Sequence, residues 1–143
     1  ETGKINLYLF DCNYYGPPDP RDAQHGTACL IQSEAFKQVG APVLLRKKTW
    51  MEEKFLSDQV DMGDTPFARE FIVLSKNPVA AQQTINGPVQ SILLEHAKKP
   101  LFNPVEIAIG SGGAVFLTGR TYEHDRLHDL LDLARQIESA FDY

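Results

Sequence analysis

The sequence has few of the residues that define several protein classes. Only two cysteines, Cys12 and Cys29, occur among 143 residues, and they do not form a C-x-x-C pair. A disulfide-dense scaffold and catalytic thiol chemistry are therefore disfavoured. No apolar run approaches the roughly 20 residues that a membrane-spanning helix needs. We therefore expect the chain as given to form a soluble domain.

Clustered positive charge is also scarce. The chain has 14 Lys and Arg residues against 19 Asp and Glu residues, which gives a net charge of −5. Proteins that bind nucleic acid usually present a basic surface. The only tight basic run here is "RKK" at residues 46–48, which is typical of a solvated strand end. We therefore expect no nucleic-acid partner.

Familiar catalytic motifs are missing too. The sequence contains no Ser-His-Asp order, no nucleophile elbow, no Walker phosphate loop and no zinc-ribbon spacing. This absence favours a non-catalytic role, and no cofactor is predicted.

The composition that is present is typical of one globular domain. Hydrophobic residues make up 43% and charged residues 23% of the chain. A chain of this length fits a single core, and no repeat or linker interrupts it. Residues 1–3, "ETG", resemble a vector remnant left after a secretion signal was removed. We assign residues 4–143 to one domain and expect the native protein to continue upstream of Lys4.

Six segments carry the β-branched and aromatic composition of strands. They are residues 4–16, 27–36, 43–50 and 67–75, and the two arms of a hairpin within residues 105–119. The proline-rich residues 16–22 are predicted to be a loop. Residues 5–12 are apolar on both sides of the first strand, which predicts cover on both faces for part of its length.

Helices are predicted in two regions. Asn77 can cap a helix that has Pro78 in its first turn, and Gly87 with Pro88 interrupts and restarts it. The last helix follows Thr121 and carries an apolar stripe from Leu127 to Phe141. The order β-β-β-β-α-β-β-α predicts an α+β fold, with a mainly antiparallel sheet and two helices packed on one face.

The two cysteines are one candidate pair. If the first two strands form a hairpin centred between Pro20 and Arg21, Cys12 and Cys29 lie opposite each other. Cross-strand Cβ atoms are about 4.5–5.5 Å apart, which is close to disulfide range. The alternative is two small buried hydrophobic residues.

A metal site is the second candidate. His124 and His128 are four residues apart on the last helix, so both side chains lie on one face and could share a metal ion. A third ligand would come from elsewhere, for example His25. The alternative is a solvated helix face whose acidic residues favour the helix start.

Three further groups have plain structural alternatives. Asp58, Asp61 and Asp64 could bind Ca²⁺ or Mg²⁺, or could form an ordinary loop that turns into the next strand. The "GSGG" of residues 110–113 stands between two strands, so we predict a hairpin turn and no phosphate site. The last group lines a pocket or marks the frayed end of the first strand: Asp11, Asn13, Tyr14 and Tyr15.

The order of motifs resembles a widespread, uncharacterised bacterial protein group, over most of residues 4–141. The matching residues are Phe10-Asp11, Leu45-Arg46, Asp61, Pro66-Phe67 and Phe71, whereas Cys12 and Val43 replace aromatic residues usual in the group. Many such proteins carry hydrophobic anchor segments ahead of this domain. The resemblance implies a soluble domain of a membrane-associated protein and transfers no catalytic residue.

These observations favour a non-catalytic interaction or ligand-sensing domain of a membrane-associated protein, on either side of the membrane. A protein partner or self-association is expected. The alternatives are a metal-dependent enzyme that uses His124 and His128, or a self-assembling structural module whose strand edges pair. Without an anchor upstream of Lys4, the protein would be cytoplasmic.

Overall fold

The computed structural model describes residues 5–16, 19–48, 57–98, 104–118 and 124–141. Within these ranges, side chains are not described for residues 12–16, 19–25, 104–105 and 124–126. The described residues form a six-stranded sheet in the order β1-β2-β6-β5-β3-β4, and each neighbouring pair is antiparallel. The strands are β1 (Asn6–Gly16), β2 (Asp19–Gln32), β3 (Val43–Lys47), β4 (Phe71–Leu74), β5 (Pro104–Gly110) and β6 (Gly113–Thr118).

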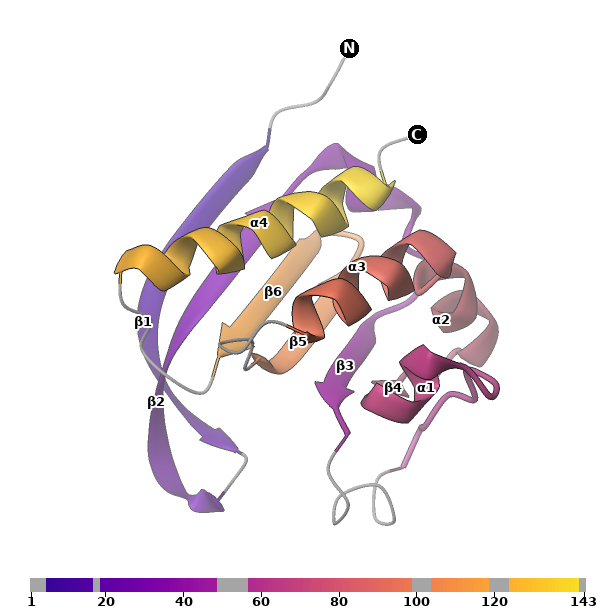
Figure 1. Cartoon of the computed structure of the whole chain (residues 1–143), viewed down its shortest axis with the longest axis horizontal. Coiled ribbons are helices and arrows are strands. Elements are labelled where there is room, and N and C mark those ends of the chain that lie inside the picture. Colours follow the sequence, from indigo (N-terminus) through magenta and orange to yellow (C-terminus); the bar gives the residue numbers. More distant parts are fainter. Residues whose placement is uncertain (1–4, 17–18, 49–56, 99–103, 119–123, 142–143) are drawn as a thin grey trace.

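Helices lie against one face of this sheet. They are α1 (Pro66–Glu70), α2 (Pro78–Thr84), α3 (Gly87–Ala97) and α4 (His124–Phe141), with the short 3-10 helix η1 (Glu34–Gln38) after β2. Figure 1 shows α3 and α4 side by side across the sheet face that is turned toward the viewer. The predicted α+β class, with a mainly antiparallel sheet and two helices packed on one face, is confirmed.

The core lies between the sheet and these helices, because apolar residues alternate along the strands and recur every three to four residues along the helices. On β3 and β6 every second residue is buried. The stripe of α4 that faces the core is formed by Leu130, Leu133, Ala134, Ile137 and Phe141, all buried. Phe141 also packs on Phe36 of η1, with ring centroids 5.2 Å apart.

The first hairpin differs from the prediction. The first strand ends at Gly16 as predicted, but residues 16–22 were expected to be a loop and β2 already begins at Asp19. The register shifts between Tyr15, which lies opposite Ala23, and Gly16, which lies opposite Asp19. Residues 20–22 therefore have no partner on β1, and Pro20 need not donate a ladder hydrogen bond.

The predicted fourth strand, residues 67–75, begins as a helix instead. Thr65 accepts a hydrogen bond from the backbone N–H of Ala68 at 3.1 Å, and Pro66 occupies the first turn of α1. The helix turns Phe67 inward, where its ring stacks on Phe71 with centroids 5.0 Å apart. Only Phe71–Leu74 is strand.

The end of the predicted second strand is also helical. The hydroxyl of Ser33 accepts a hydrogen bond from the N–H of Ala35 at 3.2 Å, which caps η1. The same hydroxyl donates to Glu138 of α4 at 2.7 Å. Ser33 thus ends β2, and it ties the start of η1 to the last helix through a carboxylate that is itself buried.

Candidate functional site

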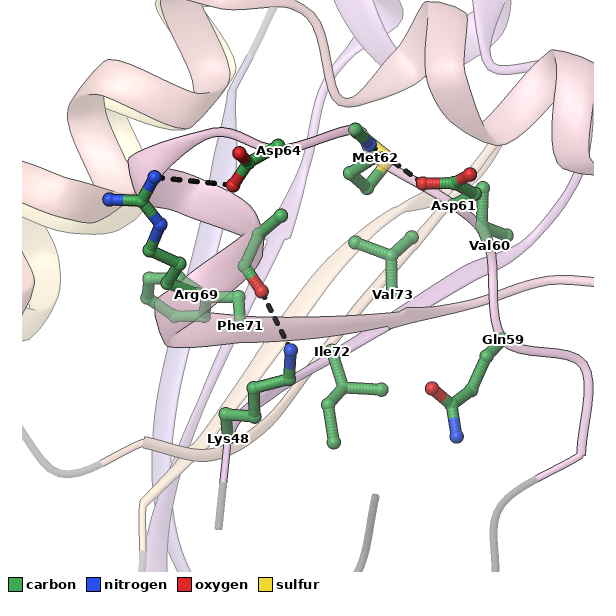
Figure 2. A pocket seen from close by; sticks show the side chains of 12 residues that line it. Lys48, Gln59, Val60, Asp61, Met62, Asp64, Arg69, Phe71, Ile72 and Val73 are labelled. Atoms are coloured by element: carbon green, nitrogen blue, oxygen red, sulfur yellow. Dashed lines mark hydrogen bonds and ion pairs between the residues drawn. The ribbon is translucent and has the colours of Figure 1, made fainter. Parts of the chain in front are cut away.

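A pocket lies along the outer side of β4, and we call it the β4 pocket. Its volume is about 540 Å³. Figure 2 shows that its walls come from β4, from Lys48 directly after β3, from the segment before α1, and from α1 itself. The residues that line it are Lys48, Gln59, Val60, Asp61, Met62, Gly63, Asp64, Ala68, Arg69, Phe71, Ile72 and Val73.

Charged groups of the β4 pocket have local partners. The Lys48 ammonium donates to the backbone carbonyl of Ala68 at 2.9 Å, and Arg69 pairs with Asp64 at 3.2 Å (Figure 2). The Arg69 and Asp64 side chains are 67% and 91% exposed, so water screens this pair. The described lining contains no Ser, Cys or His that could act as a nucleophile or as an imidazole base. The pocket offers polar groups from Lys48, Asp61 and Asp64 together with apolar contact from Met62 and β4.

The acidic residues of this segment have structural partners or are exposed. Asp61 accepts a hydrogen bond from the N–H of Gly63 at 2.8 Å, which closes a tight turn at a glycine with φ of 81°. Asp64 is held by Arg69, and Asp58 is exposed. In the part of the chain that the structure describes, no three His, Cys, Asp or Glu residues form a group that could hold a metal ion. The segment leads into α1 and not into a strand as expected, and a cation site at these residues stays a prediction.

The candidate histidines lie on α4, as predicted. His128 is exposed, while the side chains of His124 and His25 lie outside the described side chains. The proposed metal site at His124 and His128 therefore stays a prediction.

Two other candidates, residues 110–113 and the group that contains Asp11, lie in the sheet. Residues 110–113 form the β5–β6 hairpin turn, as predicted, because Gly110 lies opposite Gly113. The carboxylate of Asp11 accepts a hydrogen bond from the Thr27 hydroxyl at 3.1 Å across β1 and β2. Asp11 thus has a structural partner, and the side chains of Asn13, Tyr14 and Tyr15 lie outside the described side chains.

The predicted position of the cysteines is wrong. In the β1–β2 register Cys12 lies opposite Gly26, and Leu9 lies opposite Cys29, so the two cysteines are three ladder positions apart. Cys29 is a free cysteine, fully buried under the helices. The physical reason is the register: from Asn6 to Tyr15 the paired residues are centred on Asp19 and not between Pro20 and Arg21.

Burial raises the pKa of the Cys29 thiol from 9.0 to about 11. Since the thiolate is the reactive form, we expect Cys29 to resist alkylation at pH 8 in the native protein and to react fully in urea. Peptide mapping after iodoacetamide labelling measures Cys29 separately from Cys12. If Cys29 were labelled as fast in the native protein as in urea, the result would contradict its burial.

The same shift has a consequence for stability at high pH. Above pH 9 the thiol ionises in the unfolded chain but stays protonated in the folded one up to about pH 11. The contribution of Cys29 to stability is therefore complete below pH 9 and falls as the pH rises toward 11. The free energy of unfolding of the wild type should fall more steeply in this range than that of Cys29→Ala.

The opposite face of the sheet is a second candidate site. Residues directly opposite one another on neighbouring strands share a face, so the register defines two rows across the sheet. One row is Tyr8, Leu30, Val115, Ala108, Leu44 and Leu74, and the other is Phe10, Ala28, Leu117, Glu106, Arg46 and Ile72. We call these two rows the open face.

The open face is apolar but incompletely buried. Ten of its twelve residues are apolar. Ala28 and Ile72 are buried at 3% exposure each, yet Leu30, Leu44, Val115 and Leu117 are only partly buried, whereas their neighbours toward the helices are fully buried. Tyr8 and Phe10 are 49% and 48% exposed. The predicted cover on both faces of the first strand is therefore wrong for these two residues in the described structure.

One charged pair interrupts the open face. Arg46 Nη2 lies 3.6 Å from Glu106 Oε1, and the two side chains are 21% and 27% exposed. The Nε atom of Arg46 is buried and has no hydrogen-bond partner among the described residues. Sequence reasoning missed this site, although the apolar residues on both sides of the first strand were a signal for it.

Comparisons with known proteins support the fold only. No known protein family matches the chain, and no curated protein matches it. Among solved structures, the crystal structure of the mycobacterial trehalose monomycolate transport factor A, TtfA, is similar with a TM-score of 0.53 and 14% sequence identity. The match covers 96% of this chain and 71% of that one. None of the described helices is both long enough and apolar enough to cross a membrane.

Proposed function

We propose that this protein is a non-catalytic interaction domain that binds another protein through the open face. The observation that carries the proposal is the apolar, partly exposed second side of the sheet. In an antiparallel sheet with one solvated face, polar side chains normally occupy that face. Tyr8 and Phe10 are the exposed large hydrophobic residues of this face, and apolar side chains exposed next to one another are typical of a binding site.

The charged pair on the open face agrees with a protein partner. Arg46 and Glu106 stand among apolar side chains, and the buried Nε of Arg46 lacks an acceptor among the described residues. A buried donor without an acceptor costs free energy, about 1–3 kcal/mol. Because this donor is itself buried, a carboxylate or carbonyl on a partner would instead pair with the exposed part of the Arg46 side chain, and this contact would set the partner's orientation.

Ligand sensing is a second candidate function, and the β4 pocket favours it. The pocket has a volume of about 540 Å³, within the range of small-molecule sites, and combines apolar walls with several polar groups. Binding of a small ligand there would be expected to raise the melting temperature. Loss of that shift in Met62→Glu, but not in Val79→Glu on the exposed side of α2, would assign the ligand to the pocket.

Membrane association is part of the proposal and rests on the resemblance to the bacterial group with anchor segments. Its test is the native gene sequence upstream of Lys4. A hydrophobic segment of roughly 20 residues there would support a tethered domain, and its flanking charges would show which side the domain faces. An initiator Met with no such segment would contradict the tether.

The protein-binding proposal is tested by site-specific photocrosslinking in the source cells. A photoreactive amino acid at Val115, in the middle of the open face, should capture a partner that the same group at Val79 does not. Val79 is 64% exposed on α2 and serves as the matched control.

The captured protein is then purified, and its affinity for the chain is measured by calorimetry. We expect Leu117→Glu to weaken binding at least tenfold, about 1.4 kcal/mol, because it places a charge in the apolar contact. Val79→Glu should bind as the wild type does. A partner that binds both variants equally, or turnover of a hydrolase substrate panel that His124→Ala abolishes, would overturn the proposal.

A further inference from the structure

The two edge strands of the sheet, β4 and β1, differ in whether other described segments of the chain pair with their outer backbone groups. At β4, the segment before α1 lies against the outer side of the strand: Val60 N–H donates to Val73 carbonyl at 2.8 Å, and Ser75 N–H donates to Asp58 carbonyl at 2.9 Å. Gln59 forms a bridge with Leu74. The backbone groups of this edge are thus used within the chain.

At β1 the structure describes no such cover. Figure 1 shows β1 along one margin of the sheet, with β2 on its inner side; the start of α4 crosses in front of β1, but no described strand pairs with its outer edge. Within residues 5–11, no described backbone hydrogen bond goes beyond the pairing with β2. Alternate N–H and C=O groups of this strand therefore point outward, ready to pair with another strand.

The side chains of this edge lack the usual protection. Exposed edges are normally blocked by lysine, proline or an inward charge. Residues 5–10, "INLYLF", contain no charged residue and no proline. Four of them are exposed hydrophobic residues, namely Ile5, Tyr8, Leu9 and Phe10, at 45%, 49%, 37% and 48% exposure.

We infer that the β1 edge pairs with the β1 edge of a second copy of this chain, antiparallel about a twofold axis. This inference goes beyond the proposed function, because it concerns the sheet edge and a self-partner. Each copy carries a net charge of −5, but the edge is neutral over residues 5–10, so pairing there brings no like charges together. The result is a continuous sheet in which the two open faces join.

The register follows from the side chains. A twofold axis at Leu9 places Tyr8 of one copy opposite Phe10 of the other, on the open face. Aromatic cross-strand pairs are favourable. The same register places Asp11 opposite Leu7, so that the two Asp11 carboxylates do not face each other.

The area that becomes buried sets the expected strength. A half-exposed aromatic side chain offers roughly 100 Å² to a partner, and the four exposed side chains of two copies offer on the order of 700 Å² together. Stable interfaces bury about 1,200–2,000 Å² in total. The edge backbone adds to the sum but leaves it at or below the lower limit of this range, so we expect a weak, reversible and concentration-dependent dimer.

Sedimentation velocity over a concentration series tests the inference. The wild type should pass from monomer to dimer as its concentration rises through the micromolar range. Tyr8→Lys and Phe10→Lys, measured separately, should each raise the dissociation constant at least tenfold, because each sets a lysine in the edge contact. Val79→Lys adds the same charge at an exposed apolar position of α2 and should dimerise as the wild type does. Circular dichroism confirms that each variant is folded.

A covalent test checks the register. In a Cys12→Ser background, Leu9→Cys should form a disulfide-linked dimer on mild oxidation, because residues on the twofold axis have Cβ atoms about 4.5–5.5 Å apart. Val79→Cys should not. A wild type that stays monomeric at roughly 1 mM, or a dimer that neither lysine variant weakens, would overturn the inference. The test of the open-face partner changes Val115 and Leu117, whereas the dimer test changes residues of β1. The proposed function and this inference can therefore fail independently.

Discussion

Phe116→Ala is expected to destabilise the protein by about 3–5 kcal/mol, because the ring fills the centre of the core and its loss leaves a cavity. Phe116 is fully buried on β6, between β2 and β5, and it faces the helices. A domain of this size is stable by only about 5–15 kcal/mol. Urea unfolding followed by circular dichroism measures the change as a lower midpoint with an unchanged slope.

Leu117→Ala is the matched control for this prediction. Leu117 is the next residue of β6, but it belongs to the open face and is only partly buried. Its loss removes less buried area, so we expect a cost of about 1 kcal/mol. Equal losses for the two variants would show that both faces of the sheet are covered to the same degree, which would remove the basis of the open face.

Gly113→Ala is expected to cost about 3 kcal/mol or more, through backbone strain and overpacking together. Gly113 begins β6 with a φ of +147°, which side chains of L-amino acids rarely adopt. A Cβ built there would lie 2.2 Å from the carbonyl oxygen of Ile31. That oxygen belongs to the backbone of β2, which is paired with β6 and cannot move without disturbing the sheet.

Gly112→Ala is the control for this substitution. It is the preceding residue of the same turn, and a Cβ there would meet nothing within 4 Å. We expect a change within about 0.5 kcal/mol, as for other exposed positions. Thermal and urea unfolding of the two variants, measured together, would refute the steric account if Gly112→Ala were as damaging as Gly113→Ala.

Several elements were predictable because their signals are local. Asn77 and Asn86 accept hydrogen bonds from the N–H groups of Ala80 and Val89, at 3.1 and 3.2 Å, at the starts of α2 and α3. A short polar side chain before a proline at the first turn predicts such a cap. The signal at Thr65 and Pro66 is of the same kind, and it outweighs the strand propensity of the residues that follow.

The candidate sites were less predictable. A hairpin centre could be placed only by composition, and an error of a few residues moved the expected partner of Cys29 from Leu9 to Cys12. The β4 pocket is lined by Lys48, by the segment before α1 and by β4, which are separate segments of the sequence. No motif in the sequence indicates that these segments come together. The lining of a pocket depends on such non-local contacts, which the spacing of residues along the chain does not encode.

By itself, the sequence determined the α+β class, the β5–β6 hairpin, the cap of α2, and the core-facing stripe of α4. These depend on periodicity and on residues within one turn of each other. Only the tertiary structure decided the strand order, the register of the cysteines and the absence of a described helix over the open face. The physical reason is that the sequence shows which residues favour burial, but not what buries them. Tertiary packing decides which element, in this chain or in a partner, lies against each apolar residue.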